Sequence, residues 1–244
     1  MAAELVRRRV TVIAASATPA AIAAKPATTT IPIAFIAAED PVRLGLVASL
    51  ARPGGNLTGI NFFTAELTAK RLDLLRELLP RAVRVAVLVN PADATNTAST
   101  LRDIEAAARA IGLQLQVLNA STSPEINAAF EDIGRDRPDA LVVGGNPFLT
   151  ARRIQVVQLA AFHRLPAVYA SRDYVDVGGL MTYGANVMDA FRQLGIYAGR
   201  ILKGVKPADL PVVQSSKFEL VINVETARML GVAVRLRYLR PPTR

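Results

Sequence analysis

Polar side chains that could bind a small molecule lie where the predicted strands of this chain end. Ser16 and Thr18 follow one apolar run and precede a predicted helix, whose first N–H groups suit a carboxylate or another anion. Asp40 follows the next apolar run and could bind an ammonium group, and Asn90 and Asn146 end two later runs. Each has a structural alternative, because Thr and Asp are common helix caps and Asn is common in turns.

Aromatic side chains cluster at or near the same strand ends. They could fill the core, but apolar rings with a few polar groups also line small-molecule pockets. They are Phe62, Phe63, Phe148, Tyr169, Tyr174 and Tyr183. The predicted ligand-binding residues from this set and its surroundings are Phe63, Tyr169, Arg172 and Tyr183.

Groups suited to catalysis are scarce. His163 is the only histidine, and it lies in the last turn of a predicted helix, where partial positive charge suits the helix dipole. With no cysteine and no second histidine, most catalytic triads and zinc sites lack their parts. Walker A, G-x-S-x-G and G-x-G-x-x-G patterns are also missing. We therefore predict a binding protein and not an enzyme, with no metal and no cofactor.

The net charge of +9 invites a nucleic-acid interpretation, so the location of the charge matters. Seven of the 29 basic residues lie near the two ends: Arg7, Arg8, Arg9, Arg235, Arg237, Arg240 and Arg244. The rest of the chain has 22 basic and 20 acidic residues and is nearly neutral. It contains no pattern typical of nucleic-acid-binding modules, so we predict no nucleic-acid partner.

The spacing of the apolar runs predicts parallel sheets that would position these residues. The run VRVAVLVNP from Val83 is apolar and β-branched throughout, as in a strand covered on both faces. Similar runs begin at residues 113, 139 and 166, at intervals of 30, 26 and 27 residues, the size of one βα unit. Earlier strands are predicted at 10–14, 31–37 and 57–61. Parallel sheets bind ligands beyond the carboxyl ends of their strands.

Helices are predicted between the strands. In the helix 67–79, the predicted buried residues are Leu72, Leu75 and Leu79. In the long helix after Asn186, they are Val187, Phe191, Leu194, Ala198 and Ile201. Residues 172–179 are predicted to form a turn-rich connection.

The start of the chain has two interpretations. Arg7–Arg9 followed by VTVIAASATPAAIAA resembles an export signal, with basic, apolar and small residues in succession. The structural interpretation, which we favour, is the end of a helix, a buried strand at 10–14 and a helix from Pro19. No apolar run approaches the roughly 20 residues of a membrane span.

Several segments taken together resemble the ABC-transporter substrate-binding protein family, in the branch of tryptophan- and tyrosine-type solute receptors. They are TPAAIAAK, IPIAFIAAEDPV, ARPGGNLTGI, AELTAKRLDLLRELLP, VAVLVNP, LPAVYASRDYVDVGGLMTYG and FELVIN with ETARMLG. The resemblance covers residues 4–231 and implies an α/β protein of the type I periplasmic-binding-protein fold, with two Rossmann-like lobes joined by hinge crossovers. We expect lobe 1 at 1–79 and 180–210, lobe 2 at 80–179 and 211–234, and a disordered basic tail at 235–244.

The resemblance also implies a function. A small solute, an amino acid or aromatic compound, would bind in the cleft between the lobes and pass to a membrane permease with a separate ATPase. Thr18 would hold an anionic end and Asp40 a cationic one, with Asn90 and Asn146 approaching from lobe 2. The protein would be a periplasmic monomer. Family members usually begin with an export signal and a further strand–helix–strand unit, so we expect a truncated chain with lobe 1 incomplete. The alternatives are a ligand-sensing regulatory domain, an enzyme on the same fold and a non-functional truncated product.

Overall fold

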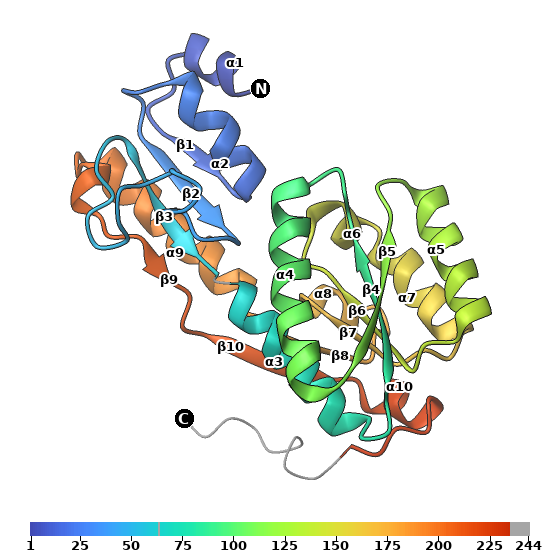
Figure 1. Ribbon diagram of the computed structural model, residues 1–244. Helices are drawn as coiled ribbons and strands as arrows, with labels where there is room; N and C mark the ends of the chain where they lie inside the picture. Colours follow the sequence, from blue (N-terminus) through green and yellow to red (C-terminus); the bar gives the residue numbers. More distant parts are fainter. Residues whose placement is uncertain (63, 235–244) are drawn as a thin grey trace. The chain divides into compact units, whose positions relative to one another are not determined.

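The computed structural model describes residues 1–62 and 64–234. Phe63 and the predicted tail at 235–244 lie outside the described residues. The chain forms two units (Figure 1). Unit 1 contains Met1–Thr64 and Ala185–Phe218, and unit 2 contains Ala65–Gly184 and the chain from Glu219 onward. The chain therefore passes between the units three times.

Unit 1 is built on a four-stranded sheet whose neighbouring strands are all parallel, in the order β1-β2-β3-β9. Its strands are β1 (Ile13–Ala15), β2 (Ile33–Ala37), β3 (Leu57–Asn61) and β9 (Val213–Gln214). Its helices are α1 (Ala2–Arg7), α2 (Thr18–Ala24) and α9 (Val187–Leu202), with 3-10 turns at Lys25–Ala27 and Pro207–Asp209. Alternate residues of β2 face opposite sides. Phe35 packs with α2 and Ile36 packs with α9, so helices cover both faces.

Unit 2 contains a six-stranded sheet in the order β10-β8-β7-β6-β4-β5. Its strands are β4 (Arg84–Val89), β5 (Gln114–Asn119), β6 (Ala140–Val143), β7 (Ala167–Tyr169), β8 (Met181–Ala185) and β10 (Phe218–Ile222). Its helices are α3 (Thr64–Leu78), α4 (Ala94–Ile111), α5 (Ser123–Asp136), α6 (Pro147–Ala151), α7 (Arg153–Phe162), α8 (Arg172–Val175) and α10 (Val224–Met229). Pairing from β5 through β4, β6 and β7 to β8 is parallel, as predicted.

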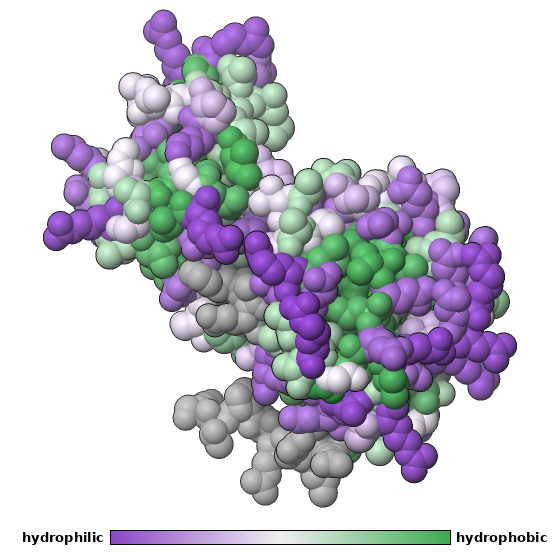
Figure 2. Space-filling view, in the orientation of Figure 1, coloured by the Kyte–Doolittle hydropathy of each residue, from purple (hydrophilic) through white to green (hydrophobic). Residues whose placement is uncertain are grey.

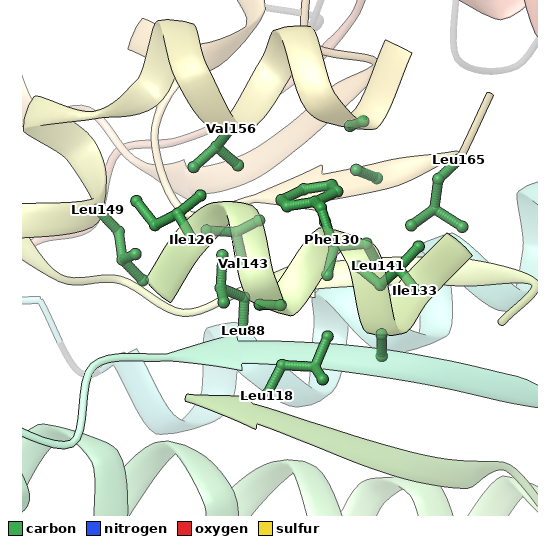
Figure 3. Packing of buried hydrophobic residues seen from close by; sticks show 14 of the residues in the cluster. Leu88, Leu118, Ile126, Phe130, Ile133, Leu141, Val143, Leu149, Val156 and Leu165 are labelled. Carbon is green, nitrogen blue, oxygen red and sulfur yellow. The ribbon is translucent and has the colours of Figure 1, made fainter. Parts of the chain in front are cut away.

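The sheet of unit 2 is also covered on both faces. Leu88 and Leu141 point to one face, where they pack against Phe130 of α5 and Val156 of α7 (Figure 3). Val87 and Val142 point to the other face, among side chains of α3 and α4. The expectation for α3 is largely confirmed, because Leu72 and Leu75 are buried.

Strand β5 does not fit the expectation of burial on both faces. It is the edge strand, and of its residues only Leu118 is buried, while the others are exposed or partly buried, with Val117 at 39% exposure. Figure 2 shows apolar surface over this part of unit 2. An apolar run alone does not distinguish an edge strand from a central one, because both carry residues that favour strands.

Three other expectations are corrected. Residues 172–175 form the helix α8 and not a turn. Asn186 caps α9, and Leu194 and Ile201 are buried, as predicted. The rest of the buried face differs from the prediction, because Ala190 and Tyr197 are buried whereas Phe191 is 45% exposed. The lobe boundaries also shift. Strand β8 pairs with β7 and α3 packs on the same sheet, so both belong to unit 2, while β9 pairs with β3 in unit 1.

The beginning of the chain follows the structural interpretation, as the helix α1, the strand β1 and the helix α2. Within the described part of the chain, no helix is long and apolar enough to cross a bilayer.

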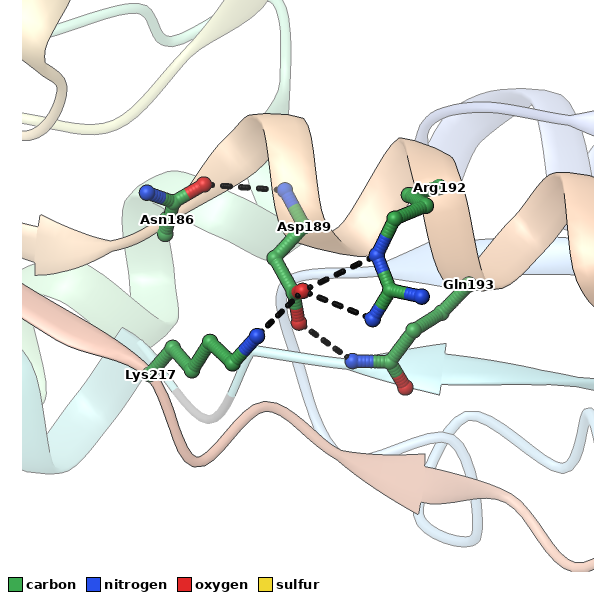
Figure 4. A network of polar contacts seen from close by, with 5 residues as sticks. All are labelled: Asn186, Asp189, Arg192, Gln193 and Lys217. Atoms are coloured by element: carbon green, nitrogen blue, oxygen red, sulfur yellow. Dashed lines mark hydrogen bonds and ion pairs between the residues drawn. The ribbon is translucent and has the colours of Figure 1, made fainter.

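A polar network in unit 1 joins two segments at which the chain enters or leaves this unit (Figure 4). The carboxylate of Asp189, a residue that is 8% exposed, accepts hydrogen bonds from Lys217 Nζ at 2.8 Å, Arg192 Nη2 at 2.9 Å and Gln193 Nε2 at 2.6 Å. The backbone N–H of Asn186 donates to the carbonyl of Lys217 at 2.8 Å. The hydrogen bonds from Lys217, then Gln193 and Arg192, lower the pKa of Asp189.

We predict that Asp189→Asn destabilises the protein at pH 7 and has a smaller effect in acid. The folded-state pKa of Asp189 lies well below its ordinary value of about 3.9, so its contribution is fully present above that ordinary value, decreases as the pH falls below it, and is lost once the pH falls through the folded-state pKa. Thermal unfolding of the variant and the parent at pH 7 and pH 3 measures this. The control is Glu225→Gln, which breaks an exposed ion pair with Arg228 and should change little. An equal effect of Asp189→Asn at both pH values contradicts the prediction.

Candidate functional site

Asn90 and Asn146 meet at the carboxyl edge of the unit 2 sheet. Asn90 follows β4 and Asn146 follows β6, and the amide nitrogen of Asn90 donates to the amide oxygen of Asn146 at 3.1 Å. Both residues are buried, at 7% and 6% exposure. The sequence predicted both residues for the site, and the structure brings them into contact.

Their position follows from the path of the chain through the sheet. From β4 the chain moves to β5 on one side, and then to β6 on the other side of β4. The carboxyl edge between β4 and β6 is therefore the point where the direction of winding reverses. Open α/β sheets bind ligands at such switch points, because the loops on either side diverge and leave a crevice.

Two further polar residues extend this pair. Asp93, the N-cap of α4, accepts from the amide nitrogen of Asn146 at 3.1 Å. The hydroxyl of Ser121 donates to the amide oxygen of Asn90 at 2.8 Å. Neither was predicted as a site residue. Asp93 follows β4 closely in sequence and Ser121 follows β5, and this position after a strand is the signal that could have identified them.

A third missed residue is Arg71 of α3. It is 3% exposed, and its Nε donates to the carbonyl of Tyr183 at 2.6 Å, while Nη2 lies 3.4 Å from the carbonyl of Ala170. These carbonyls belong to the ends of β8 and β7, so the guanidinium lies at the same edge of the sheet. Burial lowers the pKa of Arg71 to about 10, and the group remains a cation at neutral pH.

In unit 1, Thr18 does not cap the helix. It is the first residue of α2, it is 6% exposed, and its hydroxyl accepts from the backbone N–H of Ala38 at 2.9 Å. It therefore links the start of α2 to the end of β2. Ser16 is exposed in the preceding loop. Asp40 caps a turn and not a helix, since its Oδ1 accepts from the N–H of Val42 at 2.8 Å.

Tyr169 is a core residue. It is 1% exposed and stacks on Tyr174 with ring centroids 4.6 Å apart. Burial raises the pKa of both phenols. Tyr169 also lines a cavity of about 330 Å³ together with α7 and α10 residues, among them Val157 and Met229. No other predicted site residue lines this cavity.

The remaining predicted residues do not form one cluster. Arg172 is exposed and pairs with Asp176 and Glu219 at 3.3 and 3.6 Å. Tyr183 is partly buried and takes part in the site through its carbonyl, and Phe63 lies outside the described residues. His163 lies at the end of a helix as predicted, as the C-cap of α7, and its ring packs against two aromatic rings. In the described part of the chain, no group of three or more His, Cys, Asp or Glu side chains could hold a metal ion.

The fold defines the class of protein. Two units with parallel sheets, linked by three chain crossings, form the type I periplasmic-binding-protein fold. A solved periplasmic binding protein from Alkaliphilus metalliredigens shares this fold at 14% identity, with a TM-score of 0.58 over 89% of this chain and 78% of that one.

The particular family follows from sequence. The family described as ABC transporter substrate binding protein matches residues 1–243, and the chain belongs to it. A tyrosine-binding protein from Clostridioides difficile is 28% identical over 98% of this chain and 70% of its own length. A domain from Streptococcus pneumonia solved with L-Trp is 26% identical, with a TM-score of 0.87, over 98% of this chain and 82% of that one. A conserved domain protein from Vibrio cholerae is 28% identical, with a TM-score of 0.89, over 98% of this chain and 79% of that one.

We predict that Asn90→Ala lowers the free energy of unfolding by about 1–3 kcal/mol, because the Ser121 hydroxyl and the Ala92 N–H lose a buried acceptor. Urea denaturation measures the change. Asn119→Ala, at the exposed end of β5, is the matched control and should stay within about 0.5 kcal/mol of the parent. Equal effects at the two positions would show that the hydrogen-bonded pair Asn90 and Asn146 has no special role in stability.

We predict that Thr18→Val lowers the free energy of unfolding by about 1 kcal/mol, the usual contribution of one hydrogen bond. The substitution keeps the shape of the side chain and removes the acceptor for Ala38. Ser16→Ala, in the exposed loop before α2, serves as the control and should have little effect. If Thr18→Val leaves the free energy of unfolding unchanged, the hydrogen bond between Thr18 and Ala38 makes no net contribution to stability.

Proposed function

We propose that this protein is the solute-binding component of an ABC importer and that it binds an amino acid with an aromatic side chain. The observation that carries this proposal is the match over nearly the whole chain to a tyrosine-binding protein and to a domain solved with L-Trp. These relatives share 26–28% identity with the chain, and this similarity supports a ligand of the same class, which can be tested.

The carboxyl edge of unit 2 supports a binding role. The amide nitrogens of Asn90 and Asn146 each carry two hydrogens, and each donates one hydrogen bond among the described residues. The second N–H of each amide suits a ligand oxygen. Asp93 and Ser121 add further polar atoms to this pair, and Arg71 lies at the same edge of the sheet. In unit 1 we propose Thr18 and Asp40 as the residues that approach a ligand.

We further propose that the protein acts outside the cytoplasmic membrane, as a monomer, and delivers its solute to a permease driven by a separate ATPase. The family supports a transporter as partner and a small molecule as ligand. In this role the protein needs reversible binding and no chemical step on the solute.

A thermal-shift screen with the twenty L-amino acids and a set of sugars tests the proposed ligand class. L-tyrosine or L-tryptophan should raise the melting temperature by several degrees, because a ligand at a hundred times its Kd stabilises the folded state by about 2.7 kcal/mol. Glycine and L-glutamate serve as unrelated controls. No shift with any amino acid, or a shift only with sugars, would contradict the proposal.

A further inference from the structure

We propose that the guanidinium of Arg71 binds the carboxylate of the ligand. This inference rests on the proposed function, because it assigns the acidic end of an amino acid to a residue of unit 2. Three observations carry it: the buried charge of Arg71 with neutral partners, the number of donors on its guanidinium, and its place beside a glycine at the carboxyl edge of the sheet.

The first observation is a buried charge that no carboxylate balances. Arg71 is 3% exposed, and no ion pair among the described residues includes it. Its partners in the described chain are two carbonyl oxygens, of Tyr183 and Ala170. Carbonyl dipoles compensate a buried cation only in part, and buried charges are usually paired with opposite charges. An anionic ligand would complete the compensation.

The second observation is the number of donors. A guanidinium has five N–H groups in one plane, and two of its nitrogens are engaged with carbonyls. The planar fork is suited to a carboxylate, which can accept two parallel hydrogen bonds from it. Lysine at this position would lack that geometry.

The third observation is the place of Nη2, beside Gly184 at the carboxyl edge of the sheet. A Cβ on Gly184 would lie 3.8 Å from Nη2 and 2.6 Å from the carbonyl oxygen of Ala170. Because residue 184 is glycine, it places no side-chain atom beside Nη2. A Cβ on Gly145 would lie 3.2 Å from the Cβ of Ala170, so the ends of β6 and β7 are close together here. The residue after Gly145 is Asn146, which bonds to Asn90. Arg71 and the two asparagines thus lie along the same edge of one sheet.

A purely structural role is the competing explanation, in which Arg71 only ties the ends of β7 and β8 together. Arg76 provides a comparison within the same helix. It donates to the carbonyl of Ala82, before β4 begins, and so lies toward the amino ends of the strands. Both arginines bond to backbone carbonyls, but only Arg71 does so at the edge where a ligand is expected.

The first experiment uses the wild-type protein and isothermal titration calorimetry. L-tyrosine and L-tryptophan are compared with tyramine and tryptamine, which keep the ring and the amine and lack the carboxylate. We expect the amines to bind at least 100-fold more weakly, because the buried guanidinium loses its anion. Amines that bind within threefold of the amino acids overturn the assignment of Arg71 and leave the proposed function intact. If neither amino acid binds, both proposals fail.

The second experiment compares Arg71→Gln, Arg71→Lys and the control Arg76→Gln. For the amino acid that binds, we expect a loss of at least 30-fold with Arg71→Gln, about tenfold with Arg71→Lys, and less than twofold with Arg76→Gln. Affinity for the matching amine should change less than threefold in all three. Equal losses of amino acid and amine binding with Arg71→Gln would show a structural role and overturn the proposal. If Arg71→Gln fails to fold, the comparison of amino acids with amines on the wild-type protein and the affinity of Arg71→Lys distinguish the binding role from the structural one.

Discussion

Burial of the strand interiors on both faces is the constraint on which the rest of this protein depends. In β2 and β3 every residue is buried, and in β4 only Arg84 at its start is exposed. A strand buried in this way has no place, except at its ends, for polar side chains that lack a hydrogen-bond partner. The hydrogen-bonding groups of unit 2 therefore gather where β4, β6, β7 and β8 end. They satisfy one another there, as the pair Asn90 and Asn146 shows.

Much of this could be predicted from the sequence, because the parallel strands repeat at regular intervals and each ends in a polar residue. The intervals predicted parallel βα units, and the polar ends identified Asn90 and Asn146. The order of the strands could not be predicted, because each apolar run is compatible with several neighbours. For that reason β5 was expected to be covered on both faces, and β8 was assigned to the wrong lobe.

Other features depend on contacts between residues far apart in the chain. The hydroxyl of Thr18 accepts from Ala38, twenty residues away, and no local pattern distinguishes this bond from a helix cap. Tyr169 looked like a pocket residue because it ends a strand, but a large apolar ring can equally fill the core. Arg71 did leave a signal. Positions 67, 71, 74 and 78 lie on one side of α3, and the other three are buried leucines, so a charge on this stripe is unexpected.

Two buried charges in this chain have opposite surroundings, and the contrast separates a structural role from a binding role. Asp189 in unit 1 has cations as partners, Lys217 and Arg192, and the pKa of its carboxyl is lowered because the folded protein favours the charged form. Arg71 in unit 2 has only neutral partners, and the pKa of its guanidinium is lowered to about 10 because burial disfavours the charged form. The first charge is compensated within the protein. The second is compensated in part, so an anion that binds beside it gains more than the same anion would gain at an exposed arginine.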